Sequence, residues 1–313
     1  MKIFAIFPDE AYMKNMSIHT METPSNELTK LGVICSSQGE FFLSHYSSVK
    51  PEDIVIVWIG TRNESWLDML SSLKCRKFLR NIDSCKVDKI LFKREQEIFH
   101  RVGFEAMLVT YCTKDNKKFL LDRNIRSIDY PHFIDFSSYF TTPCKDKKYD
   151  ILISGQMSNH SYPVRTRVAE LLLKQGSKYK IAFLPHPGHS KQNARHPFYG
   201  ENYIKLASNC RLGSVCTGGD DAMVMKYLEF AKAGALPIGD IPSNMPDSSK
   251  ESMLSIKLED SDEDIIRKID EILLDHTKLD ERVDSYRKGM NIFDIRESTK
   301  MVLYKIVEAK YDS

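Results

Sequence analysis

Short apolar runs rich in branched residues recur along the chain and alternate with segments of helical periodicity. The strongest run in the first half spans residues 53–59 (DIVIVWI), and residues 149–154 (YDILIS) restart the pattern in the second half. Continuous runs of this length are typical of parallel strands buried on both faces, and their alternation with helices predicts an α/β fold. We also predict strands at residues 2–7, 31–35, 41–43, 76–79, 107–112, 179–184, 210–215, 235–238 and 255–258.

The helices that we predict between these strands have apolar residues at helical spacing. The best defined spans residues 222–233, where Asp221 suits a cap of the first turn and Gly234 suits a C-terminal stop. Pro163 suits the start of another helix, and the Lys-rich stretch after residue 112 has the composition of a loop. The remaining helices are predicted at residues 63–73, 86–102, 162–174, 201–208, 260–274, 282–288 and 292–310.

A break in this pattern near the middle of the chain indicates two domains. Residues 129–135 (DYPHFID) are followed by Ser, Thr, Pro143 and the charged run KDKK, a composition typical of a linker. At 313 residues the chain is long enough for two cores of ordinary size. We therefore predict an N-terminal domain at residues 1–143, a second domain at residues 144–290, and a last helix within residues 291–313.

Composition excludes several classes of protein. The net charge is +2, with acids interspersed among the bases, so we expect no nucleic-acid partner. The seven cysteines are odd in number and form no CxxC pair, which is typical of reduced thiols in the cytoplasm. No apolar run approaches the roughly 18 to 20 residues that span a bilayer. The apolar run in the first ten residues, MKIFAIFPDE, is too short for a signal peptide. We expect a soluble, cytoplasmic protein without a transmembrane segment.

The stretch GGDDAMVMKYLEFAKAGALPIGDIPSNMP, residues 218–246, carries the strongest functional signal. Gly218 and Gly219 lead from a predicted strand into a predicted helix, whose N-terminal amides suit an anion. Glu229 lies in the second half of that helix, where its carboxylate can accept hydrogen bonds from neutral hydroxyls. The chain contains no G-x-G-x-x-G, which argues against a nicotinamide or flavin dehydrogenase. The alternative is a solvated Glu229 on an ordinary amphipathic helix before a buried strand.

The run KYLEFAKAGALPIGD within this stretch resembles the donor-site segment of GT-B glycosyltransferases, K-x-x-E-x-x-A-x-G-x-x-P-(V/I). The segments YDILISG, YPVR and YIKLASNCRLGSV are similar to further parts of that family. The resemblance implies two Rossmann-like domains whose parallel sheets face a cleft, with the last helix crossing back to the first domain. It also implies that Glu229 holds the ribose of a nucleotide-sugar. Asp221, eight residues earlier, matches the first acid of an E-x7-E motif, which lies near the donor sugar in that family.

Other residues of the predicted donor site supply positive charge or line the site. Arg165 lies at a helix start, where a guanidinium can bind two phosphate oxygens; a surface salt bridge is the alternative. His186 ends a strand in the loop PHPGHSKQNARHP, whose histidine spacing matches no common zinc pattern. Lys205 or Arg211 could add charge near the phosphates. The predicted donor-binding set is Arg165, His186, Lys205, Gly218, Gly219, Asp221, Lys226 and Glu229, with no metal ligand.

These features predict a glycosyltransferase that moves a sugar from a nucleotide-diphosphate sugar to a hydroxyl of a glycan or glycoconjugate, with no metal ion or cofactor. The predicted catalytic residues are Asp9, His19 and Asp83, with His45 as a further candidate, because an acid or imidazole of the first domain could deprotonate the acceptor. Each could instead be a solvated loop residue, and Asp83 a helix cap. The alternatives in function are a non-catalytic nucleotide- or glycan-binding protein on the same fold, or a sugar-nucleotide epimerase.

Overall fold

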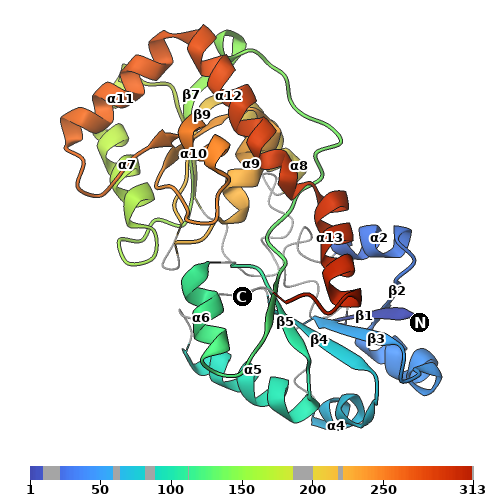
Figure 1. The fold of residues 1–313 in the computed structure, drawn as a ribbon. Helices are drawn as coiled ribbons and strands as arrows, with labels where there is room; N and C mark the ends of the chain where they lie inside the picture. The colour runs from blue at the N-terminus through green and yellow to red at the C-terminus, as the bar shows by residue number, and fades with distance from the viewer. Residues whose placement is uncertain are drawn as a thin grey trace. The chain divides into compact units, whose positions relative to one another are not determined.

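The computed structural model describes residues 1–9, 22–58, 64–81, 89–111, 113–185, 200–217 and 221–311 (Figure 1). By packing, the described residues form two compact units. Unit 1 contains those of Met1–Pro131 and Ile295–Ser313, and unit 2 contains those of His132–Gly188 and Arg195–Asp294. The domain boundaries that we drew from the sequence remain predictions.

Unit 1 is built around a parallel sheet, whose described strands have the order β2-β1-β3-β4-β5-β6; Figure 1 labels the first five strands of the chain, β1 to β5. Strands β1, β3 and β5 lie inside the sheet because their side chains are almost all apolar and buried. The strands are β1 (Ile3–Phe7), β2 (Ile34–Ser37), β3 (Ile54–Trp58), β4 (Arg76–Asn81), β5 (Ala106–Val109) and β6 (Ser127–Asp129). The helices are α2 (Glu22–Lys30), α3 (Gln38–Glu40), η2 (Phe41–His45), η3 (Tyr46–Ser48), α4 (Glu64–Ser72), α5 (Lys89–Val102), α6 (Lys114–Leu121) and α13 (Ile295–Val307).

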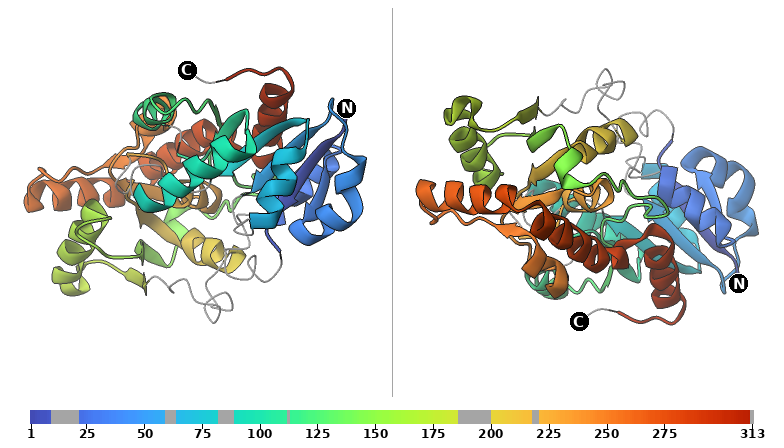
Figure 2. Two further views of the ribbon diagram at one scale, coloured as in Figure 1. Left: turned by 90° about the horizontal axis from the view of Figure 1, so that it is seen from below. Right: turned by 90° about the horizontal axis from the view of Figure 1, so that it is seen from above.

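The last helix, α13, packs in unit 1 although it is far from that unit's other elements in sequence. It contacts α2 and β6, and the dark red helix lies beside the blue end of the chain in Figure 2. Val302 and Ile306 are buried on its inner face. After α13, Tyr311 donates a hydrogen bond to the Glu105 carboxylate, which also pairs with Arg76. These contacts attach the C-terminal segment to the six-stranded sheet.

Unit 2 is built around a second parallel sheet, in which the described strands have the order β11-β10-β9-β7-β8. Because its strands run parallel, their carboxyl ends lie at one edge of the sheet, where α/β folds bind ligands. The strands are β7 (Tyr149–Gly155), β8 (Ile181–Pro185), β9 (Cys210–Ser214), β10 (Leu236–Gly239) and β11 (Leu254–Ser255). The main helices are α7 (Pro163–Lys174), α8 (Glu201–Ser208), α9 (Met225–Ala233), α10 (Asp247–Ser252), α11 (Asp262–Leu274) and α12 (His276–Met290).

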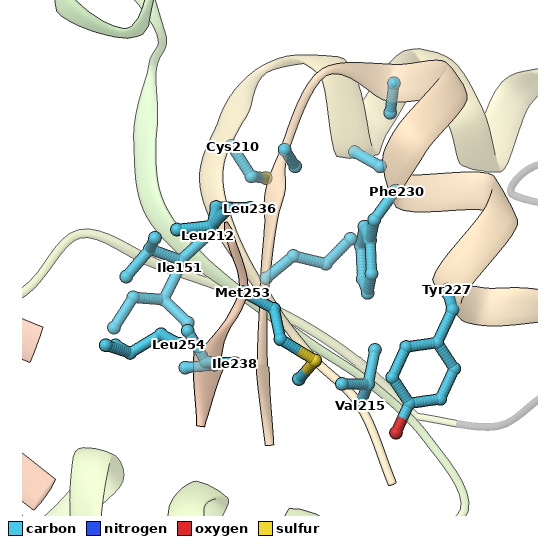
Figure 3. Packing of buried hydrophobic residues seen from close by; sticks show 14 of the residues in the cluster. Ile151, Cys210, Leu212, Val215, Tyr227, Phe230, Leu236, Ile238, Met253 and Leu254 are labelled. Carbon is cyan, nitrogen blue, oxygen red and sulfur yellow. The ribbon is translucent and has the colours of Figure 1, made fainter. Parts of the chain in front are cut away.

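Helix α9 is held against the sheet of unit 2 by the apolar core shown in Figure 3. Tyr227 and Phe230 project from α9 toward the strands, where both side chains are buried. A Cβ on Gly213 of β9 would lie 2.3 Å from the Phe230 ring, so only glycine allows the helix this close to the strand. The hydroxyl of Tyr286 also donates to the Tyr227 carbonyl at 3.1 Å. This packing positions the polar side chains on the rest of α9.

The structure confirms the predicted α/β class, with two Rossmann-like units of parallel strands. It also corrects three local predictions, two of them in unit 1. Phe41–His45 is helical rather than a strand, because helical spacing lets Phe42 pack on both Tyr46, one turn away, and Trp66. The Lys-rich stretch Lys114–Leu121 is helix α6 rather than a loop, because Thr113 caps it by accepting from the Asn116 amide.

The third correction concerns the start of α9. This helix begins at Met225 rather than at residue 222, and its N-cap is Val224, which makes no side-chain cap. The Met223 amide instead donates to the Asn244 side-chain oxygen at 2.8 Å. Asp221 has a positive φ of 51°, which no right-handed helix allows. The C-terminal prediction is confirmed, since Gly234 ends the helix in the left-handed conformation.

None of the described helices is long and apolar enough to pass through a lipid bilayer.

Candidate functional site

Arg165, in the first turn of α7, is a buried cation without an acidic partner among the described residues. It is 3% exposed. Its Nη1 donates to the Gln156 carbonyl at 3.3 Å, and its guanidinium lies over the Tyr162 ring, 4.5 Å from the centroid. Within the described ranges, its Nε has no hydrogen-bond partner. A buried guanidinium with an unused donor is suited to an anion, because burying it unpaired is costly.

The end of β7 allows a second cation to approach Arg165. Gly155, the last residue of that strand, has a φ of +100°, a conformation that L side chains rarely adopt. A Cβ at this position would lie 2.9 Å from Cε of Lys226 and 3.0 Å from Nη1 of Arg165. Glycine therefore leaves room for both side chains at the carboxyl end of the strand. Two positive charges meet there.

Lys226, in the first turn of α9, is half-buried and hydrogen-bonded only to neutral groups in the described part of the chain. Its Nζ donates to Tyr203 Oη at 3.0 Å and to Ser154 Oγ at 3.3 Å. The two hydroxyls are 2.9 Å apart, so they also share a hydrogen bond. Burial lowers the pKa of Lys226 from its ordinary 10.5 to about 8, although the nearby Glu229 carboxylate opposes this and Arg165 adds to it.

Glu229 lies one turn after Lys226 on the same helix and is half-buried. Its negative charge acts on Lys226 and on Tyr203, where it adds to the burial that raises the phenol pKa. Among the described residues no hydrogen bond or ion pair uses its oxygens; Lys232, the next cation on α9, pairs with Glu201 at 3.2 Å instead. The carboxylate of Glu229 is therefore available to accept hydrogen bonds from ligand hydroxyls.

Asp240 links Thr217, which follows β9, to helix α9. Its carboxylate accepts from the Thr217 amide at 3.0 Å and from the Thr217 hydroxyl at 2.7 Å. Its own carbonyl accepts from Tyr227 Oη on α9 at 2.8 Å. One residue at the carboxyl end of β10 thus ties Thr217 to the helix that carries Lys226 and Glu229. Sequence reasoning missed Asp240, although its place two residues after the strand predicted at residues 235–238 was a usable signal.

The predicted donor residues that the structure describes do not all lie together. Arg165 and Lys226 lie side by side at Gly155, and Glu229 follows on α9. Lys205 is exposed on α8, and its carbonyl accepts hydrogen bonds from the side chains of Ser208 and Asn209. Asp221 is exposed, and its carbonyl accepts from the amide and hydroxyl of Ser243, both at 3.0 Å. The donor-site roles of Lys205 and Asp221 remain predictions.

Arg211, the alternative phosphate ligand, is at the wrong edge of the sheet. It lies near the amino end of β9 and donates to Asp150 at 2.6 Å, near the amino end of β7. Its Nε also donates to the Cys144 carbonyl at 2.8 Å. Because β7 and β9 are parallel, this pair is separated from Gly155 by the length of the strand. Arg211 is therefore a structural ion-pair partner, and we withdraw it from the donor site.

Several predicted residues lie outside the described ranges, namely His19, Asp83, His186, Gly218 and Gly219. Asp9 is described: it follows β1 in unit 1, is half-buried, and accepts from the Gly39 amide at 3.0 Å. This bond positions the turn at α3 and leaves the catalytic role of Asp9 a prediction. His45 packs its ring 6.1 Å from that of Phe4. In the ranges that the structure describes, no three His, Cys, Asp or Glu side chains could hold a metal ion.

From the lowered pKa of Lys226 we predict how the stability of the fold depends on pH. Between pH 8 and 10.5 the folded chain has lost this proton while the unfolded chain still binds it, so the free energy of unfolding contributed by Lys226 rises with pH. Below pH 8 the partial burial of the charged Lys226 amine lowers the free energy of unfolding, and Lys226→Met removes this effect. We expect this variant to be about 1 to 2 kcal/mol more stable near pH 7, less than the roughly 3 kcal/mol that a pKa of about 8 in place of 10.5 implies, because Lys226 is only half-buried. The gain should disappear toward pH 10.5.

Urea unfolding of both proteins on either side of this pH range measures that difference. Comparing the two proteins at each pH cancels the titration of the other buried groups. A Lys226→Met variant that is less stable than the wild type near neutral pH would mean that the hydrogen bonds of Lys226 outweigh its burial.

No protein-family model matches the sequence, and no curated protein matches it. The structure is similar to that of an alpha-glucosyltransferase in complex with UDP, with a TM-score of 0.68 and 10% sequence identity, over 98% of this chain and 100% of that chain. A sucrose-phosphate synthase from Thermosynechococcus elongatus has a TM-score of 0.62 and 9% identity, over 99% and 100% of the two chains. Anabaena HepE in complex with UDP and glucose has a TM-score of 0.59 and 8% identity, over 98% and 100%.

At these identities the similarity establishes the fold. The chain has the GT-B fold, in which two α/β units each contain a parallel sheet, and the similarity spans almost the whole of this chain. This confirms the fold that the donor-segment resemblance implied.

Proposed function

We propose that this chain, which has the GT-B fold, is a glycosyltransferase. It would move a sugar from a nucleotide-diphosphate sugar to a hydroxyl of a glycan or glycoconjugate, without a metal ion. One observation carries the proposal: at the carboxyl edge of the unit 2 sheet, Arg165 and Lys226 meet without a carboxylate paired to either in the described ranges. Two such cations match the negative charge of a diphosphate. Glu229, with unused acceptor oxygens, stands one helical turn away.

In this proposal the diphosphate contacts the Arg165 guanidinium and the Lys226 ammonium, and Glu229 accepts from the ribose hydroxyls. Helix α9 adds its N-terminal amides near Lys226, where its dipole favours negative charge. Metal-free binding is consistent with this arrangement because the cations needed to neutralise the phosphates are already in the chain. Several structures of similar fold contain UDP or UDP-glucose, which makes UDP the first nucleotide to test.

The reaction forms a bond between the acceptor oxygen and the anomeric carbon of the donor sugar, and breaks the bond from that carbon to the diphosphate. The acceptor hydroxyl loses its proton to a base of the protein or to the departing diphosphate, which gains negative charge as its bond to the sugar breaks. Stabilising this charge is the largest catalytic contribution that we assign, and Arg165 and Lys226 supply it. A base that removes the proton directly is needed if the configuration inverts, and Asp9, His19 and Asp83 remain the candidates.

Glu229→Ala tests the assignment of the nucleotide. We expect the affinity for the preferred nucleoside diphosphate to fall about 10- to 100-fold, because a charged acceptor of ribose hydroxyls is lost. The protein should fold normally, since no hydrogen bond within the described part of the chain depends on this carboxylate. The measurement is the rise in melting temperature with UDP, GDP, ADP and dTDP, followed by calorimetry with the best of them.

Glu170→Ala is the matched control, because Glu170 is an exposed glutamate on α7 of the same unit. An affinity in the Glu229 variant equal to that of the wild type would remove the ribose role. Slow hydrolysis of the matching nucleotide-sugar distinguishes a transferase from a protein that only binds nucleotides. Interconversion of the donor without an acceptor would instead show an epimerase.

A further inference from the structure

The ammonium of Lys226 is held by two neutral hydroxyls from two different elements. Ser154 comes from β7 and Tyr203 from α8, and both accept hydrogen bonds from Nζ. An ammonium has three N–H donors, so the described residues leave one donor for a ligand. Two further charged groups face it: Arg165 from α7 and Glu229 from the same helix.

Tyr203 contacts Lys226 in two ways. Its hydroxyl accepts from Nζ at 3.0 Å, and the ammonium also lies over the Tyr203 ring, 4.3 Å from the centroid. Tyr203 is itself 5% exposed, and its hydroxyl is braced by Ser154 at 2.9 Å. Burial and the charge of Glu229 raise its pKa well above the ordinary value, so the phenol stays a neutral acceptor at neutral pH.

We propose that Tyr203 is a positioning residue: with Ser154 it holds the ammonium of Lys226 beside Arg165, so that both cations contact the same diphosphate. This inference rests on the proposed function and deepens it. Neither Tyr203 nor Ser154 needs to touch the ligand; their effect passes through Lys226. The lysine stem has four flexible carbons, and without these acceptors its ammonium would occupy several positions around Gly155.

The same contacts couple the binding of a diphosphate to the protonation of Lys226. Burial favours the neutral amine of Lys226, whereas the two hydroxyl acceptors and Glu229 favour the ammonium. A bound diphosphate adds negative charge beside Nζ, so binding should take up a proton when the pH is above about 8. The affinity for a nucleoside diphosphate should therefore be constant below that pH and fall above it.

Tyr203→Phe removes the hydroxyl and keeps the ring, so it isolates the hydrogen bond. Near pH 7 we expect about a tenfold lower affinity for UDP, the size expected when a charged donor loses an acceptor. The fall in affinity with rising pH should also start at a lower pH, because the ammonium has lost a group that stabilises it. Calorimetry with UDP on both sides of pH 8 measures the two effects. Ser154→Ala should lower the affinity for UDP and the pH at which that affinity begins to fall, as Tyr203→Phe does.

Tyr162→Phe is the matched control, since the Tyr162 ring lies under Arg165 but no hydrogen bond to its hydroxyl occurs within the described ranges. It should leave the affinity and the pH profile unchanged. If UDP fails to bind, GDP, ADP and dTDP replace it. A Tyr203→Phe protein with wild-type affinity and pH profile, in a chain that needs Arg165 for binding, would overturn the positioning role alone. A wild-type chain that binds none of the four nucleotides would overturn the proposed function, and this inference with it.

Discussion

Arg165→Ala should lower turnover about 1000-fold, the largest effect that we expect from a single side chain. The guanidinium is placed to stabilise charge that develops on the departing diphosphate, and loss of one such donor typically costs 10²- to 10³-fold in rate. The fold should survive, because Arg165 donates a single hydrogen bond to protein, to the Gln156 carbonyl, among the described residues. Steady-state rates with the nucleotide-sugar identified by thermal shift measure the effect.

Two variants control this experiment. Arg165→Lys keeps the charge and loses the planar fork, so it should recover only part of the lost rate. Arg167→Ala removes a cation two residues away that binds the carbonyls of Leu258 and Asp260 and the carboxylate of Asp262. That variant should lose stability and keep its turnover. Normal kinetics in Arg165→Ala would move the leaving-group role to Lys226 and refute our assignment.

Gly155→Ala should have the second-largest effect, because it acts on both cations at once. The new methyl would lie within 3.0 Å of Arg165 and of Lys226, so both side chains must move. The φ of +100° adds backbone strain of about 1 to 3 kcal/mol. We expect a lower melting temperature together with a fall of about 100-fold in nucleotide affinity, the sum of two displaced charge-assisted contacts.

Gly176→Ala is the control that separates the effect of backbone strain on stability from the effect of displaced cations on nucleotide binding. Gly176 lies in the same unit, has a φ of +60°, and a Cβ there would meet no atom within 4 Å. This control should lower the melting temperature and leave nucleotide binding intact. If Gly155→Ala loses stability without losing affinity, the cations do not meet their ligand at the end of β7.

Hydrophobic patterning predicted the positions of most strands and helices but not all of their boundaries. The runs predicted at residues 53–59 and 149–154 contain the strands β3 (Ile54–Trp58) and β7 (Tyr149–Gly155), whose side chains are mostly buried, because continuous apolar runs suit a sheet covered on both faces. Phe41–His45 misled the same reasoning, since a three-residue apolar run fits a strand and a helix equally well. The aromatic partner that decides the outcome, Trp66, lies in a different helix.

The sequence by itself determined the fold class and the helix that carries Glu229, because both depend on local signals: apolar periodicity, and the Glu, Gly and Pro of one short segment. Only the tertiary structure placed Arg165 beside Lys226 and assigned Arg211 to Asp150. It also brought Ser154 and Tyr203 together, which are 49 residues apart in the chain. A periodic pattern reports which side of an element is buried. It does not report which side chains of separate elements meet, because the order of strands in the sheet decides that.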